Sequence, residues 1–276
     1  MTDNLGIHVD PPLAPIPGIL SAAGVHAFQT TLRDPRRLSK EGVPDEEDRQ
    51  AFLAECRRLG PFRGIVHASL LTSLGSPDPR IRNGSAGALV SDANLAAALG
   101  LDGVCFHAGY EKGHASRAEA LAAVTRKLAE VVGRLEPGAR VLIENGCEGT
   151  ELGQTVGELA TVVDGVDAGP DRLGVVLDTC HLHVAGLDLA APGSEIRLAD
   201  IVVASGLAPY LAALHLNDAL APCGSHRDRH ATPGKGTIGD GLLRIVRHDL
   251  FRQLPAILEL GIDDALQGIE FLRNSA

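Results

Sequence analysis

Short apolar segments recur along almost the whole chain, and most are separated by longer stretches with helical periodicity. Several segments, such as VLIE and GVVLD, are continuously apolar, which is typical of parallel strands buried on both faces. Alternating strands and helices predict right-handed βαβ units, and eight such units predict a closed (β/α)8 TIM barrel of the α/β class. We expect the strands at Gly6–Asp10, Gly24–Thr30, Gly64–Ala68, Gly103–His107, Arg140–Glu144, Leu173–Asp178, Leu211–Leu216 and Pro255–Glu259.

The segments between these strands carry helix signals. Ser116 and Glu119 form a capping-box pattern before a long amphipathic stretch that Pro137 and Gly138 end. Residues 11–19 contain four prolines, and we expect an irregular loop there. The length of 276 residues suits one barrel, so we expect a single domain over residues 1–276. Further helices are expected at Asp45–Leu59, Arg80–Leu99 and Glu151–Val163.

Residue types that commonly bind metal ions stand at the ends of six expected strands or directly after them. Successive strand-end residues of this kind are 40, 37, 34, 37 and 44 residues apart, about the length of one βα unit. The carboxyl ends of barrel strands converge on one face, which carries the active site in TIM-barrel enzymes. Nine side chains from distant parts of the chain should therefore meet there: His67, His107, Glu144, Asp178, His181, His215, Asp228, His230 and Glu259.

Five imidazoles and four carboxylates are a typical ligand set for divalent metal ions. Imidazole suits zinc, iron or copper, and carboxylate suits zinc, manganese or magnesium. Nine ligands exceed the needs of one ion, and four clustered carboxylates without cations would repel one another. The sequence therefore predicts two or three bound ions. His8 and His26 lack comparable neighbours, and we expect structural roles for them.

Composition limits the environment and the partners of the chain. Five cysteines without a CxxC pair do not indicate a disulfide framework, which favours a reducing, cytoplasmic location. No apolar run is long enough to span a membrane, so we expect no membrane association. The formal charge of −10 argues against a nucleic-acid partner, although bound cations at the site would offset part of it. We expect a monomer.

Several segments resemble signature segments of endonuclease IV, the second family of apurinic/apyrimidinic endonucleases, within the xylose-isomerase-like TIM-barrel superfamily. LGVVLDTCH, LHLNDALAPCGSHRDRH and GKGTIG carry the resemblance, together with IVHASLLTSLGSPDP, GVCFHAGYEKG and VLIENGCEG. The resemblance runs from about residue 60 to residue 260, and all nine ligand positions match the family by residue type. It implies a hydrolase that cleaves a phosphodiester 5′ to an abasic site in DNA, as in DNA repair.

The resemblance also implies how the ligands are shared among three divalent ions, with zinc expected first and manganese or iron as alternatives. His67, His107 and Glu144 would hold one ion. Glu144, Asp178, His215 and Glu259 would surround a second, and His181, Asp228 and His230 would hold the third. A hydroxide bridging two ions would attack phosphorus, and Glu144 and Glu259 would orient it as the catalytic residues.

The sequence departs from the family at positions that contact the substrate. Leu70 and Ser73 stand where the family has Tyr and Asn, and Leu220 stands where it has Lys. The expected DNA-probing loop, TTLRDPRRLS, keeps arginines but has no aromatic wedge. As substrate contacts we expect Arg33, Asn217 and Arg229.

Three other functions compete with cleavage of abasic DNA. The same trinuclear site could serve a phosphatase or phosphodiesterase for a small phosphorylated metabolite or nucleotide, which the acidic charge and the lost DNA contacts favour. A sugar isomerase or epimerase would use one or two ions, but it would not require the extra group of His181, Asp228 and His230. A metal store or binding scaffold does not explain a complete ligand set.

Overall fold

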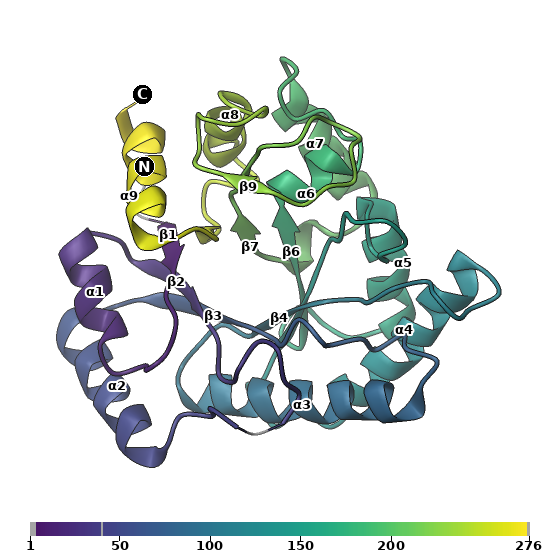
Figure 1. Cartoon of the computed structure of the whole chain (residues 1–276), viewed down its shortest axis with the longest axis horizontal. Coiled ribbons are helices and arrows are strands. Elements are labelled where there is room, and N and C mark those ends of the chain that lie inside the picture. The colour runs from purple at the N-terminus through teal and green to yellow at the C-terminus, as the bar shows by residue number, and fades with distance from the viewer. Residues whose placement is uncertain (1–3, 40, 275–276) are drawn as a thin grey trace.

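The computed structural model of the chain, described over residues 4–39 and 41–274, is a closed barrel of parallel strands, as expected (Figure 1). The strand order around the barrel is β1-β10-β7-β6-β5-β4-β3-β2. A separate antiparallel pair, β8 (Asp218–Ala219) and β9 (His230–Ala231), follows β7. The barrel strands are β1 (Leu5–His8), β2 (Ala27–Thr30), β3 (Arg63–His67), β4 (Val104–His107), β5 (Val141–Glu144), β6 (Leu173–Asp178), β7 (Leu211–His215) and β10 (Ala256–Leu258).

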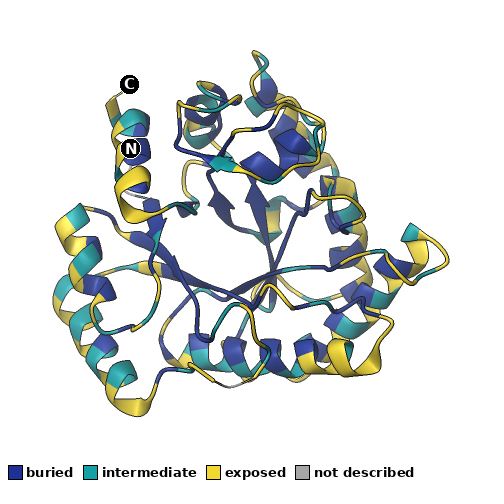
Figure 2. Cartoon of the chain, in the orientation of Figure 1, coloured by how far each residue is buried: buried dark blue, intermediate teal, exposed yellow. Residues whose placement is uncertain are grey.

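Helices surround the barrel, with exposed outer faces and buried inner faces (Figure 2). Among the helices of the described residues, none is long and apolar enough to cross a bilayer. The α-helices are α1 (Ile16–Ala23), α2 (Glu46–Leu59), α3 (Pro79–Ala98), α4 (Arg117–Val132), α5 (Val156–Val166), α6 (Thr179–Val184), α7 (Ser194–Ala204), α8 (Gly241–Arg247) and α9 (Ile262–Asn274), and Ala208–Tyr210 forms a 3-10 turn.

Side-chain oxygens cap several of the helices that the sequence predicts. The Ser116 side chain accepts a hydrogen bond from the backbone N–H of Glu119 at the start of α4, which confirms Ser116 as the N-cap, while the Glu119 side chain accepts from the N–H of Ala115 instead of that of Ser116. Two expectations were wrong. Residues 16–19 are helical, because Pro17 lies in the first turn of α1, where no N–H is needed. Helix α5 begins at Val156 rather than at Glu151, because Thr155 caps it.

The interior of the barrel explains where the polar side chains must point. One apolar layer inside it includes Ile65, Cys105, Leu142, Val176, Ala213 and Ile257. Side chains alternate between the two faces of a strand, so the residue two positions further along points to the same side. Two positions further along these six strands stand His67, His107, Glu144, Asp178, His215 and Glu259. The apolar layer is therefore the floor on which the polar site is built.

Candidate metal centre

The structure brings all nine expected ligands together at the carboxyl ends of the strands. Each lies within 3.7 Å of at least one other member of the set. Six project from strand ends, and His181 lies in the first turn of α6, where the Asp178 side chain caps the helix by accepting the N–H of His181 at 2.8 Å. Asp228 and His230 come from the loop between β8 and β9 and its edge.

Glu144 lies at the centre of one part of the set and is fully buried. Its Oε2 atom is 3.3 Å from His67 Nε2 and 3.4 Å from His107 Nε2. Its Oε1 atom is 2.7 Å from His215 Nδ1, which in turn is 3.3 Å from Glu259 Oε2. The two oxygens thus face different groups of nitrogen donors, as expected of a carboxylate that bridges two ions.

Asp228 is at the centre of the other part. Its oxygens lie 3.3 Å from His181 Nε2 and 3.1 Å from His230 Nε2. Both nitrogens are buried and, within residues 4–39 and 41–274, neither makes a hydrogen bond of acceptable geometry. Buried nitrogens that converge on carboxylates without hydrogen bonding to them fit a coordinated cation between the groups. The ligand atoms of His67, His107 and Glu144 likewise lie within 4.8 Å of one another, as do those of Asp178, His181 and His230.

Hydrogen bonds to the distal ring nitrogens fix which nitrogen can coordinate a metal. His67 Nδ1 is 2.8 Å from the Ala68 carbonyl oxygen, and His181 Nδ1 is 2.9 Å from that of Asn145. Each of these nitrogens carries the proton, because a carbonyl only accepts, so Nε2 keeps a free lone pair toward the site. Such outer contacts orient the histidines of metal sites. The arrangement therefore favours coordination over simple ion pairing.

The electrostatics show that the site requires positive charge. Burial of His215 disfavours its proton, but the Glu144 and Glu259 charges outweigh burial and raise its pKa to about 9. Burial likewise disfavours the proton of His230, while its contact with Asp228 and the charge of Asp178 raise that pKa to about 9. Protons on these imidazoles balance the carboxylates in the metal-free chain, so metal binding must displace them.

The loop that supplies Asp228 and His230 is held by another buried carboxylate. Asp218 accepts hydrogen bonds from the backbone N–H groups of Gly234 and Gly236, both at 3.0 Å, and of Ile238 at 2.9 Å. Backbone N–H groups, and not a cation, thus compensate the negative charge of the Asp218 carboxylate. These bonds fix the path of the backbone after β9. The folded backbone therefore positions Asp228 and His230.

Three polar residues next to the ligands were not among the sequence-predicted site residues. His8 is the last residue of β1, Gln29 is the penultimate residue of β2, and Glu151 Oε1 lies 3.1 Å from His107 Nδ1. Gln29 and His8 stand two positions after Ala27 and Gly6, so the alternation that places the ligands also places them at the site. Glu151 carried no such signal, because it lies in a loop.

Gln29 contacts three groups of the site through one buried amide. Its Oε1 atom accepts from His215 Nε2 at 2.7 Å, which leaves His215 Nδ1 free to coordinate. Its Nε2 atom donates to Glu259 Oε1 at 2.6 Å and lies 3.2 Å from His8 Nδ1. Gln29 therefore sets the tautomer of one ligand and the orientation of another.

Replacing Gln29 with leucine should weaken metal binding by roughly 10–100-fold, the usual effect of losing an outer-shell partner. Leucine is similar in volume but cannot fix the His215 ring. Competition against a chromophoric chelator measures the affinity for zinc, and Gln267→Leu on the outer surface of α9 is the matched control. Unchanged affinity in Gln29→Leu would show that His215 is oriented without this amide.

The expected substrate contacts do not share one location. Arg33 is only 3% exposed, and its guanidinium forms an ion pair with Asp92 and donates to the carbonyls of Leu38 at 2.9 Å and Ser39 at 2.7 Å. Arg33 was expected at the substrate, but the structure buries it and uses it to hold the loop after β2. The loop sequence could not reveal this, because the partner lies on the distant helix α3.

Asn217 and Arg229 also differ in what they can contact. Asn217 is buried, donates to Asp178 Oδ2 at 2.6 Å and Glu259 Oε2 at 3.0 Å, and accepts the backbone N–H of Glu259 at 2.9 Å. Its amide is thus engaged in orienting two ligands instead of facing a substrate. Arg229 is exposed between Asp228 and His230, and its guanidinium donates to the backbone carbonyl of Asp228, so its contact with a substrate stays a prediction.

A barrel that brings nine histidine and carboxylate side chains together at the carboxyl ends of its strands has the architecture of a TIM-barrel metalloenzyme. A family model described as a xylose isomerase-like TIM barrel matches residues 18–275. A probable endonuclease 4 from Akkermansia muciniphila is 35% identical over 249 residues, which cover 90% of this chain and 88% of the relative. Another, from Chlorobium luteolum, is 39% identical over 220 residues, or 76% of each protein. The chain belongs to the endonuclease IV family.

Solved structures agree with this assignment. Endonuclease IV from Thermus thermophilus superposes with a TM-score of 0.83 at 28% identity and covers 98% of this chain and 97% of its own. A D-tagatose 3-epimerase-like protein has a TM-score of 0.73 at 19% identity, covering 97% of this chain and 95% of its own. The second likeness shows a shared fold alone, so it does not support the isomerase alternative.

Proposed function

We propose that the chain hydrolyses a phosphodiester 5′ to an abasic site in DNA, using three divalent ions with zinc expected first. The observation that carries the proposal is the complete ligand set, grouped around Glu144 and Asp228, in a chain that belongs to the endonuclease IV family. The group around Asp228 favours a phosphoesterase over an isomerase, because isomerisation does not need a third ion.

Three groups of ligands would hold the ions. His67 and His107 would share one with Glu144, and the group around Asp228 would hold another. The remaining ion would lie among Glu144, Asp178, His215 and Glu259. When bound, the ions would supply a water of lowered pKa and positive charge opposite the phosphate. The ions would supply the fixed positive charge that the cavity needs, because no Lys or Arg is among the lining residues described for the central cavity.

The catalytic carboxylates are held rigidly before any substrate arrives. Gln29 holds one oxygen of Glu259 and Asn217 holds the other. Glu144 lies above the apolar floor and is held by His215. The cavity over them has a volume of about 300 Å³, which admits one phosphoryl group and its attached sugar. Pre-positioned acceptors orient an attacking water without a reorganisation cost during the reaction.

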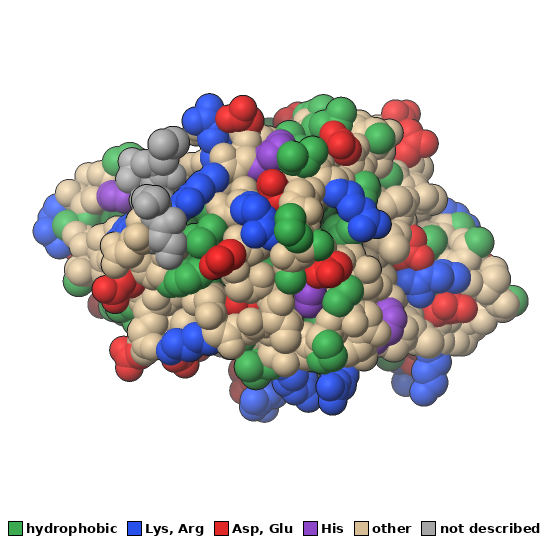
Figure 3. Space-filling view, turned by 90° about the horizontal axis from the view of Figure 1, so that it is seen from above, with side chains coloured by type: hydrophobic (Ala, Val, Ile, Leu, Met, Phe, Trp, Pro, Cys, Tyr) green, Lys and Arg blue, Asp and Glu red, His purple; other side chains and the backbone are tan. Residues whose placement is uncertain are grey.

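A small phosphoester is the second candidate substrate. Leu70 is 66% exposed where it lines the central cavity, and Leu220 on β8–β9 is 63% exposed, so apolar side chains occupy positions where a DNA backbone needs polar partners. Figure 3 shows one side of the molecule, over the helices that surround the barrel, where basic and acidic side chains are interspersed. The whole chain has a formal charge of −10, whereas a protein that binds duplex DNA is normally basic.

An assay on matched substrates tests the proposal. Metal-loaded protein should nick a duplex with one abasic site at catalytic rates and leave the undamaged duplex intact. Treatment with a chelator should abolish the cleavage, and zinc should restore it. Turnover of small phosphodiesters without any nicking would assign the chain to the second candidate. No hydrolysis of any phosphoester by the loaded protein would refute both.

A further inference from the structure

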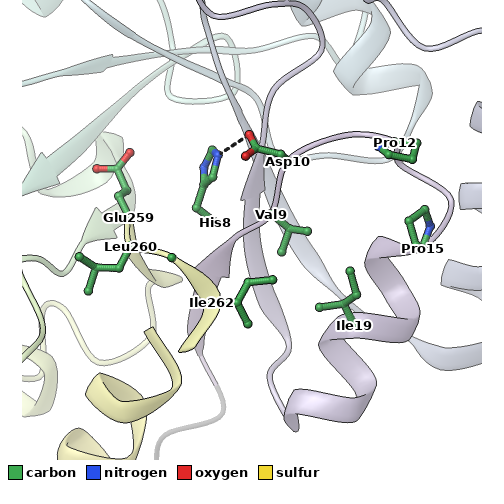
Figure 4. A pocket seen from close by; sticks show the side chains of 10 residues that line it. His8, Val9, Asp10, Pro12, Pro15, Ile19, Glu259, Leu260 and Ile262 are labelled. Carbon is green, nitrogen blue, oxygen red and sulfur yellow. Dashed lines mark hydrogen bonds and ion pairs between the residues drawn. The ribbon is translucent and has the colours of Figure 1, made fainter. Parts of the chain in front are cut away.

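A second cavity, of about 680 Å³, lies beside the metal centre between the loop after β1, helix α1 and the start of α9 (Figure 4). We propose that it binds the nucleobase of a small nucleoside phosphodiester whose phosphate lies at the metal centre. This inference rests on the proposed function and deepens its second candidate, a small phosphoester, because a duplex cleaved 5′ to an abasic site has no base on the sugar that follows the cleaved phosphate. The lining consists of His8, Val9, Asp10, Pro12, Pro15, Ile19, Glu259, Leu260, Gly261 and Ile262.

The cavity is continuous with the central one. His8, Asp10 and Glu259 line both, so a ligand can have one end in each. In Figure 4, the side chains of Glu259 and His8 lie at one end and those of Pro15 and Ile19 at the other. A substrate with its phosphate among the ligands therefore extends an attached group past His8 into the second cavity.

The walls select an uncharged, apolar group. Val9, Pro12, Pro15 and Ile19 form one wall, and Leu260 and Ile262 form the other. No Lys or Arg is among the residues described as lining the cavity, and its two carboxylates repel anions, so a second phosphate is excluded. A bare sugar would lose its hydrogen bonds to water against these walls. A planar base fits between apolar surfaces and buries both of its faces.

The inner end of the cavity offers polar recognition of such a base. His8 Nε2 is 3.2 Å from Asp10 Oδ1, and His8 Nδ1 is 3.2 Å from the amide nitrogen of Gln29. The Gln29 amide donates to Nδ1, so the proton of the neutral His8 ring lies on Nε2, toward Asp10. The Asp10 side chain is 79% exposed and keeps acceptor capacity. Amino and ring N–H groups of a base are suitable donors to it.

The proline-rich wall exists before the ligand binds. The backbone N–H groups of Leu13 and Ala14 both donate to the carboxylate of Asp48 on α2, each at 2.9 Å. Leu13 is fully buried, and its carbonyl accepts the N–H of Ile16 at 3.0 Å. Proline further restricts the backbone of this loop. A fixed wall favours a rigid planar ligand, because little entropy is lost when the ligand binds.

Two phosphodiesters that differ only in the attached group test the subsite. The nucleoside ester is thymidine 5′-(4-nitrophenyl phosphate), and the control ester is methyl 4-nitrophenyl phosphate. We expect kcat/KM to favour the nucleoside ester by at least about tenfold. Ile262→Asp should remove most of this preference, and Ile19→Asp should act in the same way. Ile196→Asp is the matched control, because Ile196 is also an exposed isoleucine in the first turn of a helix, α7.

Calorimetric titration with thymidine and with 2-deoxyribose provides a readout that does not depend on hydrolysis. Thymidine should bind the native chain and lose affinity in Ile262→Asp, while 2-deoxyribose should not bind measurably. Hydrolysis of both esters at equal rates, with no thymidine binding, would overturn the subsite and leave the proposed function intact. Binding of thymidine without hydrolysis of any phosphoester would retain the subsite and overturn the proposed function.

Discussion

Replacing Glu144 with glutamine is expected to lower phosphodiester hydrolysis by more than about 100-fold, beyond the usual loss for an outer-shell partner. Both oxygens of Glu144 face imidazole nitrogens, and an amide nitrogen in place of either one cannot coordinate a metal. The variant should also bind less metal, because two of the three groups of ligands share this residue. Steady-state kinetics and elemental analysis of the same preparation measure both effects.

Glu136→Gln is a suitable control for that variant, because Glu136 is exposed in the loop before the amino end of β5, at the opposite end of the barrel from the expected ligands. The control should retain wild-type turnover and metal content. Full activity in Glu144→Gln would contradict the bridging role. Loss of activity with an unchanged metal content would show that Glu144 orients the attacking water but is not needed to hold the metal ions.

Replacing Arg33 with methionine should lower the free energy of unfolding by roughly 3–5 kcal/mol, as expected when one partner of a buried ion pair is removed. Both side chains of the pair are at most 3% exposed, so the variant leaves the charge of Asp92 inside the protein. It also removes two hydrogen bonds to the loop after β2. Chemical denaturation measures the change.

Two further variants separate this effect from general loss of charge. Arg37 forms ion pairs with Asp34 and Glu41 on the surface, and Arg37→Met should cost less than about 1 kcal/mol. Combining Arg33→Met with Asp92→Leu should recover much of the lost stability, because no unpaired charge remains. If the Arg33→Met variant had wild-type stability but bound duplex DNA more weakly, Arg33 would be a substrate contact and not a structural residue.

The fold and the convergence of the nine expected ligand side chains were predictable because both follow from periodicity. Every second residue of a barrel strand faces the barrel interior. The last inward-facing side chain of each strand therefore lies at the face formed by the carboxyl ends of the strands. That rule applies equally to Gln29, which was not among the expected site residues, and to His8, for which a structural role was expected. A glutamine is seldom a ligand, and its role became visible only through its contacts with His215 and Glu259.

The contacts of individual polar side chains were less predictable. Arg33, Asn217 and Arg229 all belong to segments near the site, but only the folded chain shows that the first two point inward and the third outward. The limit is physical, because burial of a loop side chain depends on partners that lie far away in sequence. Asp92, on α3, is such a partner for Arg33.

The most direct test of the account is the number of metal ions that each chain retains. Purified protein should be loaded with zinc, freed of excess metal by gel filtration and analysed for zinc and protein together. We predict about three ions per chain, about two in His230→Ala, and fewer than two in Glu144→Gln. One ion per chain in the unmodified protein, with no change in His230→Ala, would contradict a multinuclear centre.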